Sequence, residues 1–292
     1  MPAYTISKKA PIRSRSKVRA SSLTPSQIRS FQKRVYNYYD SHGRDLPWRK
    51  RVTSYRVLVS EIMLQQTQVD RVIEKYKEFL AAFPDLPALA KAPLPKLLKL
   101  WSGLGYNRRA LSLKALAQVV VSEHKGRLPY DPDILRTLPG IGPYTAGAIA
   151  AFAFNRPVVF MDTNIRRVYI HEFLHDRRNI HDDELVPLVR QTLDANNPRK
   201  WYNALMDYGS LLKKEQGNPN KRSAHYIRQS PFENSNRQVR GRILKVLVKG
   251  PPLTAASIVK GTGMDAERVA MNLEQLAREG FIMKRRGRYL IE

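Results

Sequence analysis

Two carboxylic acids and a glycine-rich turn are the residues of this chain whose types and order indicate chemistry. Glu61 lies in an apolar stretch, residues 138–146 read Leu-Pro-Gly-Ile-Gly-Pro-Tyr-Thr-Ala, and Asp162 follows eighteen residues after Tyr144. An acid, a phosphate-binding turn and a second carboxylate are the parts needed to cleave a glycosidic bond in DNA.

The apolar surroundings of Glu61 predict an unusual acid. Tyr55 and residues 57–59 precede it and residues 62–64 follow it, and all of them are apolar or aromatic. Because burial disfavours the charged form, such a carboxyl has a raised pKa and stays protonated near neutrality, fit to donate a proton. The alternative is a solvated glutamate on a helix face, the commoner environment of this residue type.

The glycine-rich turn has the composition of an anion-binding hairpin. Gly140 and Gly142 permit a tight turn and close backbone approach, and Pro143 suits the first position of the next helix. The free amides and the positive end of that helix then face a phosphate. Two other interpretations stay open, an ordinary helix–helix turn and a dinucleotide-binding fingerprint that lacks its third glycine and its preceding strand. Asp162, in turn, is also placed to cap a helix that begins at Asn164.

Charge and composition favour a polyanionic partner. The 292 residues include 51 Lys and Arg against 25 Asp and Glu, which gives a net charge of +26. Double-stranded DNA suits such a field, whereas no apolar run approaches the ~20 residues of a membrane-spanning helix. The absence of cysteine excludes disulfides, thiolate–zinc sites and iron–sulfur clusters.

Changes in composition divide the chain into four parts. Residues 1–24 carry six Lys or Arg and no acid, and we expect a disordered basic arm without a signal-peptide core. Residues 25–212 have a helical pattern almost throughout, beginning with a helix over 26–41 capped near Thr24. Residues 213–235 are a basic loop or linker. Residues 236–292 predict a winged helix, with helices over 238–248, after 253–254 and over 265–278, then a hairpin around Arg286-Gly287.

Several motifs occur in order at the spacing of one known family. They are Leu46-Pro47-Trp48, the segment 60–68 (Ser-Glu-Ile-Met-Leu-Gln-Gln-Thr-Gln), the segment 100–106 (Leu-Trp-Ser-Gly-Leu-Gly-Tyr), the hairpin at 138–146 and the segment 161–168 (Met-Asp-Thr-Asn-Ile-Arg-Arg-Val). Together they resemble the helix-hairpin-helix (HhH-GPD) DNA glycosylases, most closely the MutY-type adenine glycosylases. The resemblance implies an all-α catalytic region of two lobes that close over a flipped base, followed here by the winged helix.

The resemblance also implies catalytic roles. Glu61 becomes the acid that protonates the leaving purine, and Asp162 stabilises the cationic sugar electrostatically or by transient covalent attachment. Tyr144 and Asn164 match positions that hydrogen-bond at the sugar and the carboxylates. Bifunctional relatives carry a lysine at the position of Tyr144 to form a Schiff base, so we expect a monofunctional enzyme that leaves an abasic site.

Contacts to the base and to DNA are implied at further positions. Arg44, Trp48 and Asp207 match the lining of the base pocket, and Gln66 and Tyr106 match residues that wedge into the duplex. Further DNA contacts are expected at Gln65, Gly140, Gly142, Lys213, Lys214, Lys221, Arg222, Lys284, Arg285 and Arg286.

Two departures from the family pattern are visible. Relatives usually carry four cysteines after the segment that matches 207–210, whereas residues 213–222 here read Lys-Lys-Glu-Gln-Gly-Asn-Pro-Asn-Lys-Arg. We therefore expect a form without an iron–sulfur cluster and without any other cofactor. The usual C-terminal domain, which reads 8-oxoguanine, is not recognisable, and the winged helix replaces it.

The resulting hypothesis is a monomeric, cytoplasmic, nucleoid-associated glycosylase that excises adenine opposite 8-oxoguanine or guanine. Alternatives are a thymine or uracil mismatch glycosylase and a non-catalytic DNA-binding regulator. The sequence leaves open the opposite base, the role of the winged helix and whether the basic arm is a targeting signal. His171-Glu-Phe-Leu-His175 fits a zinc-protease pattern, but Arg178 stands where that family needs glycine, so no metal site is expected.

Overall fold

The computed structural model describes residues 22–248 and 250–292. The basic arm expected over residues 1–24 lies, up to residue 21, outside the described residues. No helix within the described part of the chain is both long and apolar enough to cross a membrane.

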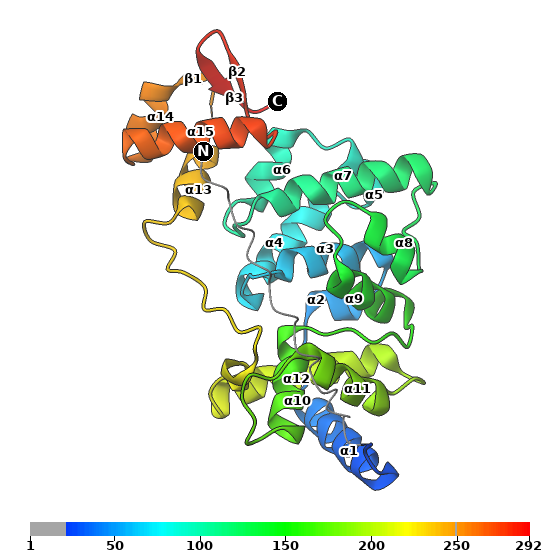
Figure 1. Ribbon diagram of the computed structural model, residues 1–292. Coiled ribbons are helices and arrows are strands. Elements are labelled where there is room, and N and C mark those ends of the chain that lie inside the picture. Colours follow the sequence, from blue (N-terminus) through cyan, green and yellow to red (C-terminus); the bar gives the residue numbers. More distant parts are fainter. Residues whose placement is uncertain (1–21, 249) are drawn as a thin grey trace, which may run out of the picture.

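Residues 25–222 form two helical lobes (Figure 1). One lobe holds α2 (Pro47–Lys50), α3 (Ser54–Leu64), α4 (Val69–Ala82), α5 (Leu86–Ala90), α6 (Leu94–Trp101), α7 (Arg108–Glu123), α8 (Pro132–Thr137) and α9 (Pro143–Phe154). The other holds α1 (Pro25–His42), α10 (Thr163–Phe173), α11 (Asp182–Thr192), α12 (Pro198–Glu215) and the short 3-10 helix η1 (Pro219–Arg222). The all-α, two-lobed prediction for this region is confirmed.

Capping residues set the starts of the helices that matter most. Thr24 caps α1, as predicted, by accepting a hydrogen bond from the Gln27 amide; the structure shows in addition that the Gln27 side chain bonds back and completes a capping box. Asp162 caps α10 with its carboxylate, which confirms its predicted capping role.

Each lobe has an aromatic core. In the lobe of α1, the Phe31 ring makes edge-to-face contacts with Tyr169, Phe173 and Trp201. In the other lobe, Phe79 packs edge-on against Phe83 and Trp101. The helix α9 is buried along residues 145–152 and contacts α3, α8 and α12, so it joins the two lobes.

The C-terminal domain, residues 236–292, has the order of elements expected of a winged helix. It contains α13 (Asn236–Leu247), β1 (Leu253–Thr254), α14 (Ala255–Thr262), α15 (Ala266–Arg278), β2 (Met283–Arg285) and β3 (Arg288–Leu290). The strands form an antiparallel sheet in the order β1-β3-β2, with Leu253 opposite Tyr289 and Met283 opposite Leu290. Arg286 and Gly287 both have positive φ, as a two-residue hairpin turn requires.

One detail of this domain differs from the sequence interpretation. Leu253 and Thr254 form a third strand, which was not foreseen. Asn272, a polar residue of α15, is buried, and its side-chain amide donates to the Arg268 carbonyl at 2.8 Å.

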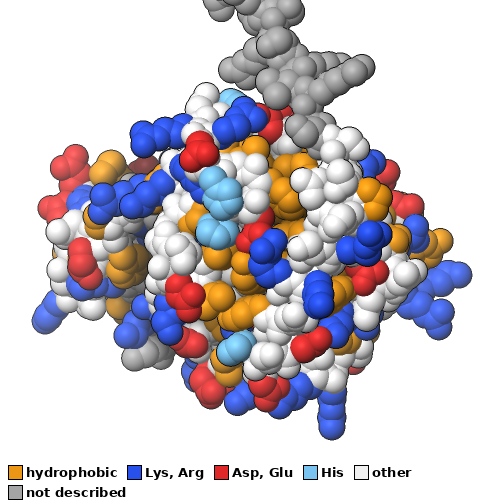
Figure 2. Space-filling view, turned by 90° about the horizontal axis from the view of Figure 1, so that it is seen from below, with side chains coloured by type: hydrophobic (Ala, Val, Ile, Leu, Met, Phe, Trp, Pro, Cys, Tyr) orange, Lys and Arg blue, Asp and Glu red, His pale blue; other side chains and the backbone are white. Residues whose placement is uncertain are grey.

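Charged side chains of both signs share one face of the molecule. Seen from below, where α1 lies in Figure 1, Asp and Glu side chains stand among the Lys and Arg rather than apart from them (Figure 2). The net positive charge is therefore not gathered on this face.

Candidate active site

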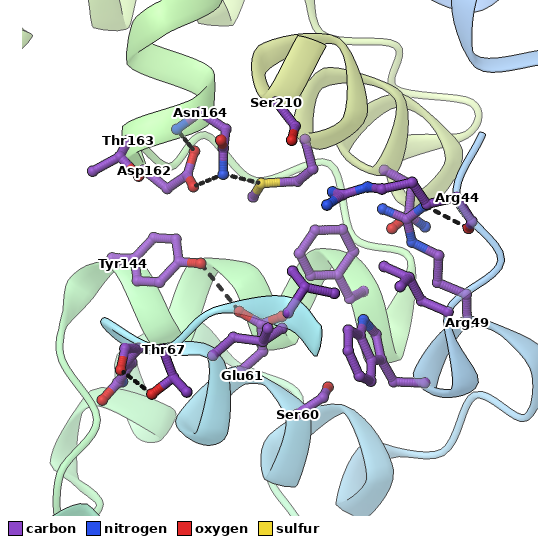
Figure 3. A pocket seen from close by; sticks show the side chains of 18 of the residues that line it. Arg44, Arg49, Ser60, Glu61, Thr67, Tyr144, Asp162, Thr163, Asn164 and Ser210 are labelled. Carbon is purple, nitrogen blue, oxygen red and sulfur yellow. Dashed lines mark hydrogen bonds between the residues drawn. The ribbon is translucent and has the colours of Figure 1, made fainter. Parts of the chain in front are cut away.

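A cavity of about 790 Å³ has both predicted carboxylic acids in its lining. Glu61 comes from α3, Tyr144 from the first turn of α9, and Asp162 from the start of α10. Figure 3 shows Glu61 and Asp162 on opposite walls, with Tyr144 beside the space between them. The fold thus brings together three catalytic candidates that lie far apart in the sequence.

Glu61 is a buried acid, as its apolar neighbours predicted. The residue is only 8% exposed, and the Tyr144 hydroxyl donates to its Oε2 at 3.1 Å. Burial raises the pKa of Glu61 to about 7; the charge of Asp162 adds to this, while the Tyr144 hydrogen bond and Arg49 oppose it. The solvated-glutamate alternative is therefore wrong, and the carboxyl is substantially protonated at neutral pH.

Asp162 has the environment of a carboxylate rather than of a neutral acid. It accepts hydrogen bonds from the amides of Asn164 at 2.9 Å and Ile165 at 2.6 Å, and from the Asn164 side chain at 3.1 Å. Burial raises the pKa of Asp162, and these three donors act against that rise. Since Glu61 has one such donor and Asp162 has three, Asp162 is the member of the pair that carries the negative charge.

A longer chain of hydrogen bonds fixes the orientation of Asn164. Arg167 donates from Nη1 to Asn164 Oδ1 at 2.8 Å and to the Gly209 carbonyl at 2.6 Å. Gly209 must be small, because a Cβ there would lie 2.6 Å from the Asn164 carbonyl oxygen. Arg167, which the sequence analysis did not single out, is therefore a positioning residue for Asn164 and Asp162.

The predicted base-pocket residues separate into a lining and a support. Arg44 and Trp48 line the cavity together with Arg49, which was not predicted. Asp207 does not line it: the carboxylate lies behind the arginines and accepts from Arg44 Nε at 2.6 Å and from both terminal nitrogens of Arg49 at 2.8 Å. Burial opposes ionisation of Asp207, but the hydrogen bonds and charges of Arg49 and Arg44 outweigh it and lower the pKa of that carboxyl. Asp207 thus orients two guanidinium groups on the pocket wall.

The glycine-rich hairpin joins α8 to α9. Gly140 has a φ of +77°, and a Cβ on it would lie 2.6 Å from Ser112 Cβ of α7. The amides of Gly140 and Gly142 have no hydrogen-bond partner among the described residues, and both glycines are exposed. Free amides at the start of α9 are the arrangement that the sequence predicted for phosphate binding.

The two predicted wedge residues lie on loops with strained backbone. Gln66 has a φ of 54° and Tyr106 a φ of 45°, and both belong to the left-handed region. Gln65 differs in its environment, because its side chain donates to Thr145 of α9 at 3.1 Å and so ties the end of α3 to the hairpin helix.

Arg109 holds both wedge loops and was not foreseen. Its guanidinium donates to the carbonyls of Ile62, Met63 and Gln65 from one terminal nitrogen, and to Thr67 Oγ1, Leu104 and Gly105 from the other. Burial lowers its pKa to about 10. Most of its acceptors are backbone carbonyls, which leave no signature in the sequence.

The segment 213–222 does not fit the iron–sulfur cluster of the family. It supplies no thiolate, and its polar side chains are used to hold η1 against α10. Asn220 donates to the Thr163 carbonyl at 2.7 Å, and Arg222 donates to the Leu174 carbonyl at 2.7 Å and to that of His175. The guanidinium of Arg222, predicted to contact phosphate, therefore caps the end of α10.

The other predicted basic contacts are exposed. Lys213 belongs to the lining of the active-site cavity, whereas Lys214 and Lys221 do not. In the wing, Lys284 and Arg286 are exposed, and Arg285 forms an ion pair with Glu292 at 2.9 Å.

The histidine motif at 171–175 is not a metal centre within the described residues. The helix α10 ends at Phe173, so His171 lies within it and His175 lies beyond it, whereas the zinc-protease pattern needs both histidines on one helix. Glu172 accepts a hydrogen bond from the Tyr208 hydroxyl at 2.7 Å and pairs with Arg34 at 3.3 Å. No group of three or more metal-ligating side chains occurs in the part of the chain that the structure describes.

Known proteins share this sequence over most of the catalytic region. Residues 59–187 match the family described as HhH-GPD superfamily base excision DNA repair protein. An adenine DNA glycosylase of Mycolicibacterium smegmatis is 35% identical over 246 residues, which cover 77% of this chain and 83% of that protein. An adenine DNA glycosylase of Buchnera aphidicola is 38% identical over 187 residues, covering 62% and 52% of the two chains. The human adenine DNA glycosylase is 36% identical over 199 residues, covering 64% and 36%.

The chain spans about half the length of several of these relatives or less. Among solved structures, a thermostable thymine-DNA glycosylase aligns with a TM-score of 0.58 at 27% identity, over 64% of this chain and 87% of that one. A trapped endonuclease III–DNA complex, at 21% identity and a TM-score of 0.52, shares the fold over 74% of this chain and 95% of the other. With its two carboxylic acids, its hairpin and these relatives, the chain belongs to the HhH-GPD superfamily, and within that superfamily it is MutY-like.

Proposed function

We propose that the protein is a DNA glycosylase that hydrolyses the N-glycosidic bond of adenine mispaired with 8-oxoguanine or guanine. The observation that carries the proposal is the pairing of a buried acid, Glu61, with a hydrogen-bonded carboxylate, Asp162, across one cavity. Relatives named adenine DNA glycosylase support the choice of adenine.

In this reaction Glu61 protonates the purine, because its pKa of about 7 keeps a proton available at neutral pH. As the bond to the base breaks, positive charge develops on the sugar, and Asp162 stabilises it either electrostatically or through a transient covalent bond. The Tyr144 hydroxyl orients Glu61, and Asn164 orients Asp162. General acid catalysis of this kind contributes ~10²–10⁴-fold to the rate.

The extruded base fits between the acid and the arginine wall. Trp48 offers a flat apolar surface, and the Nε of Arg49 is buried without a partner among the described residues. An unpaired N–H donor can bond to the ring nitrogens or carbonyl groups of a nucleobase, whereas an apolar ligand would leave it without a partner.

Duplex DNA is the partner, and the protein acts on it as a monomer. The hairpin amides bind a phosphate, Gln66 and Tyr106 occupy the space that the base leaves, and Lys213, Lys214 and Lys221 add phosphate contacts. The wing residues Lys284, Arg285 and Arg286 add contacts from the C-terminal domain. An iron–sulfur cluster takes no part, since residues 213–222 supply no thiolate and Asn220 and Arg222 hold η1 against α10 instead.

Strand cleavage is not part of this reaction. Tyr144 cannot form the Schiff base that a lysine forms, so the product is an abasic site in an intact strand.

The test is a panel of duplexes that each contain one mismatch, incubated with the protein and then treated with alkali to break the strand at abasic sites. Breaks at adenine opposite 8-oxoguanine or guanine are expected. The likeness to a thymine-DNA glycosylase favours thymine opposite guanine as the second candidate. Breaks only at thymine or uracil would show that this base, and not adenine, is the substrate. If the protein binds the duplexes tightly but no breaks appear in any of them, it is a DNA-binding regulator without glycosylase activity.

A further inference from the structure

A second cavity lies between the wedge loops and the C-terminal domain. It measures about 1420 Å³, nearly twice the active-site cavity of about 790 Å³. Its walls come from α4, the end of α6 and the start of α7 on one side, and from α13 and the end of α15 on the other. We call it the interdomain groove.

The interdomain groove adjoins the active site along one edge. Gln65, Gln66, Thr67 and Gln68, together with Gln229 of the linker, line both cavities. Tyr106 lines only the groove. Gln66 therefore stands at the boundary between the cavity that holds the catalytic acids and the groove, and Tyr106 lies on the groove side of that boundary.

Positive charge is concentrated in the groove. Its lining contains nine cationic side chains against two glutamates: Arg71, Lys75, Lys99, Arg108, Arg109, Arg237, Arg240, Arg242 and Lys245 against Glu233 and Glu279. Both glutamates are already engaged. Glu279 pairs with Arg108 at 3.1 Å and Arg240 at 2.6 Å, and Glu233 accepts from the Gln238 amide at 2.6 Å. The face that contains α1, by contrast, mixes both signs (Figure 2).

Several of these cations have no acidic partner in the described chain. Lys99 and Lys245, one on each wall, are exposed and form neither an ion pair nor a hydrogen bond with any described residue. Arg71 likewise forms no ion pair with a described residue. Unneutralised cations on two facing walls attract a polyanion that lies between them.

The C-terminal domain and its linker reach Tyr106 directly. Arg237 of α13 donates to the Tyr106 hydroxyl at 2.8 Å and lies over its ring, 5.5 Å from the centroid. Arg109 lies 5.7 Å from the same centroid, and Gln229 also donates to the hydroxyl. The wedge tyrosine is thus held in place from the groove side.

We propose that the interdomain groove binds the DNA strand opposite the one that carries the extruded base. The inference rests on the proposed function, in which Gln66 and Tyr106 fill the place of that base. If the extruded nucleotide lies on the side of Glu61 and Asp162, the strand left in the duplex lies beyond the wedge residues, and the groove occupies that position. The C-terminal domain then contacts DNA through α13 and not only through its basic wing.

The test measures binding, not excision, so that it does not depend on the proposed reaction. The ligand is a duplex with a tetrahydrofuran abasic analogue opposite guanine, prepared in three forms: with all phosphates charged, with neutral methylphosphonates at the linkages flanking that guanine, and with methylphosphonates flanking the analogue. The variant is Lys99→Ala with Lys245→Ala. The control is Lys33→Ala with Lys91→Ala, two exposed lysines that line neither cavity.

Each lost phosphate contact lowers the salt slope by about 0.9 and the affinity by roughly eightfold at 0.1 M salt. For the fully charged duplex we therefore expect the groove variant to bind roughly 60-fold more weakly, with a slope reduced by about 1.8, and the control to bind as the wild type does. The difference in affinity between the groove variant and the wild type should nearly vanish on the duplex with methylphosphonates flanking the guanine. It should persist on the duplex with methylphosphonates flanking the analogue.

Three results overturn the proposal: unchanged affinity of the groove variant, an equal loss in the control, or a loss that vanishes only when the analogue strand is neutralised. Failure of the proposed function is a separate result, because a protein that releases no adenine from the mismatch panel still gives a readable outcome here.

Discussion

Replacement of Glu61, the proposed catalytic acid, should make the protein more stable while removing its activity. The pKa of Glu61 is raised from 4.5 to about 7 by burial, and each pKa unit corresponds to 1.36 kcal/mol, so ionised Glu61 costs the folded state roughly 3 kcal/mol. Glutamine has the same shape and no charge, and its side-chain oxygen still accepts the Tyr144 hydrogen bond. Glu61→Gln should therefore avoid this cost.

The sign of the effect follows from proton counting. Between pH 4.5 and about 7 the unfolded chain has lost the Glu61 proton and the folded protein has kept it, so the unfolded state binds fewer protons. Wild-type stability accordingly falls across this window as the pH rises, and the loss is complete above it. The variant should be more stable than the wild type by roughly 3 kcal/mol at pH 8, and the difference should shrink toward zero near pH 4.

Equilibrium urea unfolding of both proteins at several pH values measures this difference. Glu123→Gln, which removes an exposed carboxyl at the end of α7 in the same lobe, controls for the loss of one negative charge. In parallel, single-turnover base release by the wild type should fall about tenfold per pH unit above about 7, as Glu61 loses its proton, and the variant should lose ~10²–10⁴-fold at every pH. A variant that is less stable at pH 8, or a difference that does not change with pH, would show that Glu61 is not a buried, protonated acid.

Three further predictions test the surroundings of the pair. Asp207→Asn should destabilise the fold by roughly 3 kcal/mol in urea and slow base release, because it leaves Arg44 and Arg49 without their buried anion. Asp45→Asn, which breaks only the exposed pair with Lys50, should cost no more than ~1 kcal/mol. Gly140→Ala should lower the free energy of unfolding by at least ~1 kcal/mol, since its φ is +77° and its new Cβ would meet Ser112; Gly142→Ala, in open space at a φ of −90°, is the control, and equal losses would refute the argument. Borohydride should not trap the wild type on abasic DNA, whereas Tyr144→Lys should be trapped measurably, and trapping of the wild type would point to an amine elsewhere.

The sequence was sufficient where local rules govern the structure. The apolar residues around Glu61 predicted its burial, and the position of Asp162 predicted the cap of α10; the structure confirms both. The wing turn at Arg286-Gly287 was also foreseen. A two-residue hairpin turn needs positive φ at both residues, and few residue types, glycine above all, adopt it readily. In each case the determining neighbours are within a few positions along the chain.

The sequence was insufficient where partners come from distant elements. Asp207 was predicted to line the pocket, yet its carboxylate lies behind Arg44 and Arg49. These two arginines precede Asp207 by 163 and 158 residues, and their long side chains extend to the short carboxylate on α12. Contacts between residues so far apart in the sequence leave no local pattern. Arg222 was expected at a phosphate, and instead it caps α10 through backbone carbonyls. The interdomain groove depends on how a separate domain packs against the wedge loops, which no periodicity encodes.

The strained wedge loops explain why this lobe needs a residue such as Arg109. Left-handed backbone at Gln66 and Tyr106 costs roughly 1 kcal/mol or more at each residue. The two loops persist in this conformation because one planar guanidinium donates to carbonyls on both, and to the last turn of the helix that carries Glu61. A lysine could not reproduce these bonds, since its ammonium lacks the two-branched geometry. Arg109 therefore fixes the two loops and the end of the helix that carries Glu61. Under the proposed function, this couples the predicted wedge residues Gln66 and Tyr106 to the position of the acid.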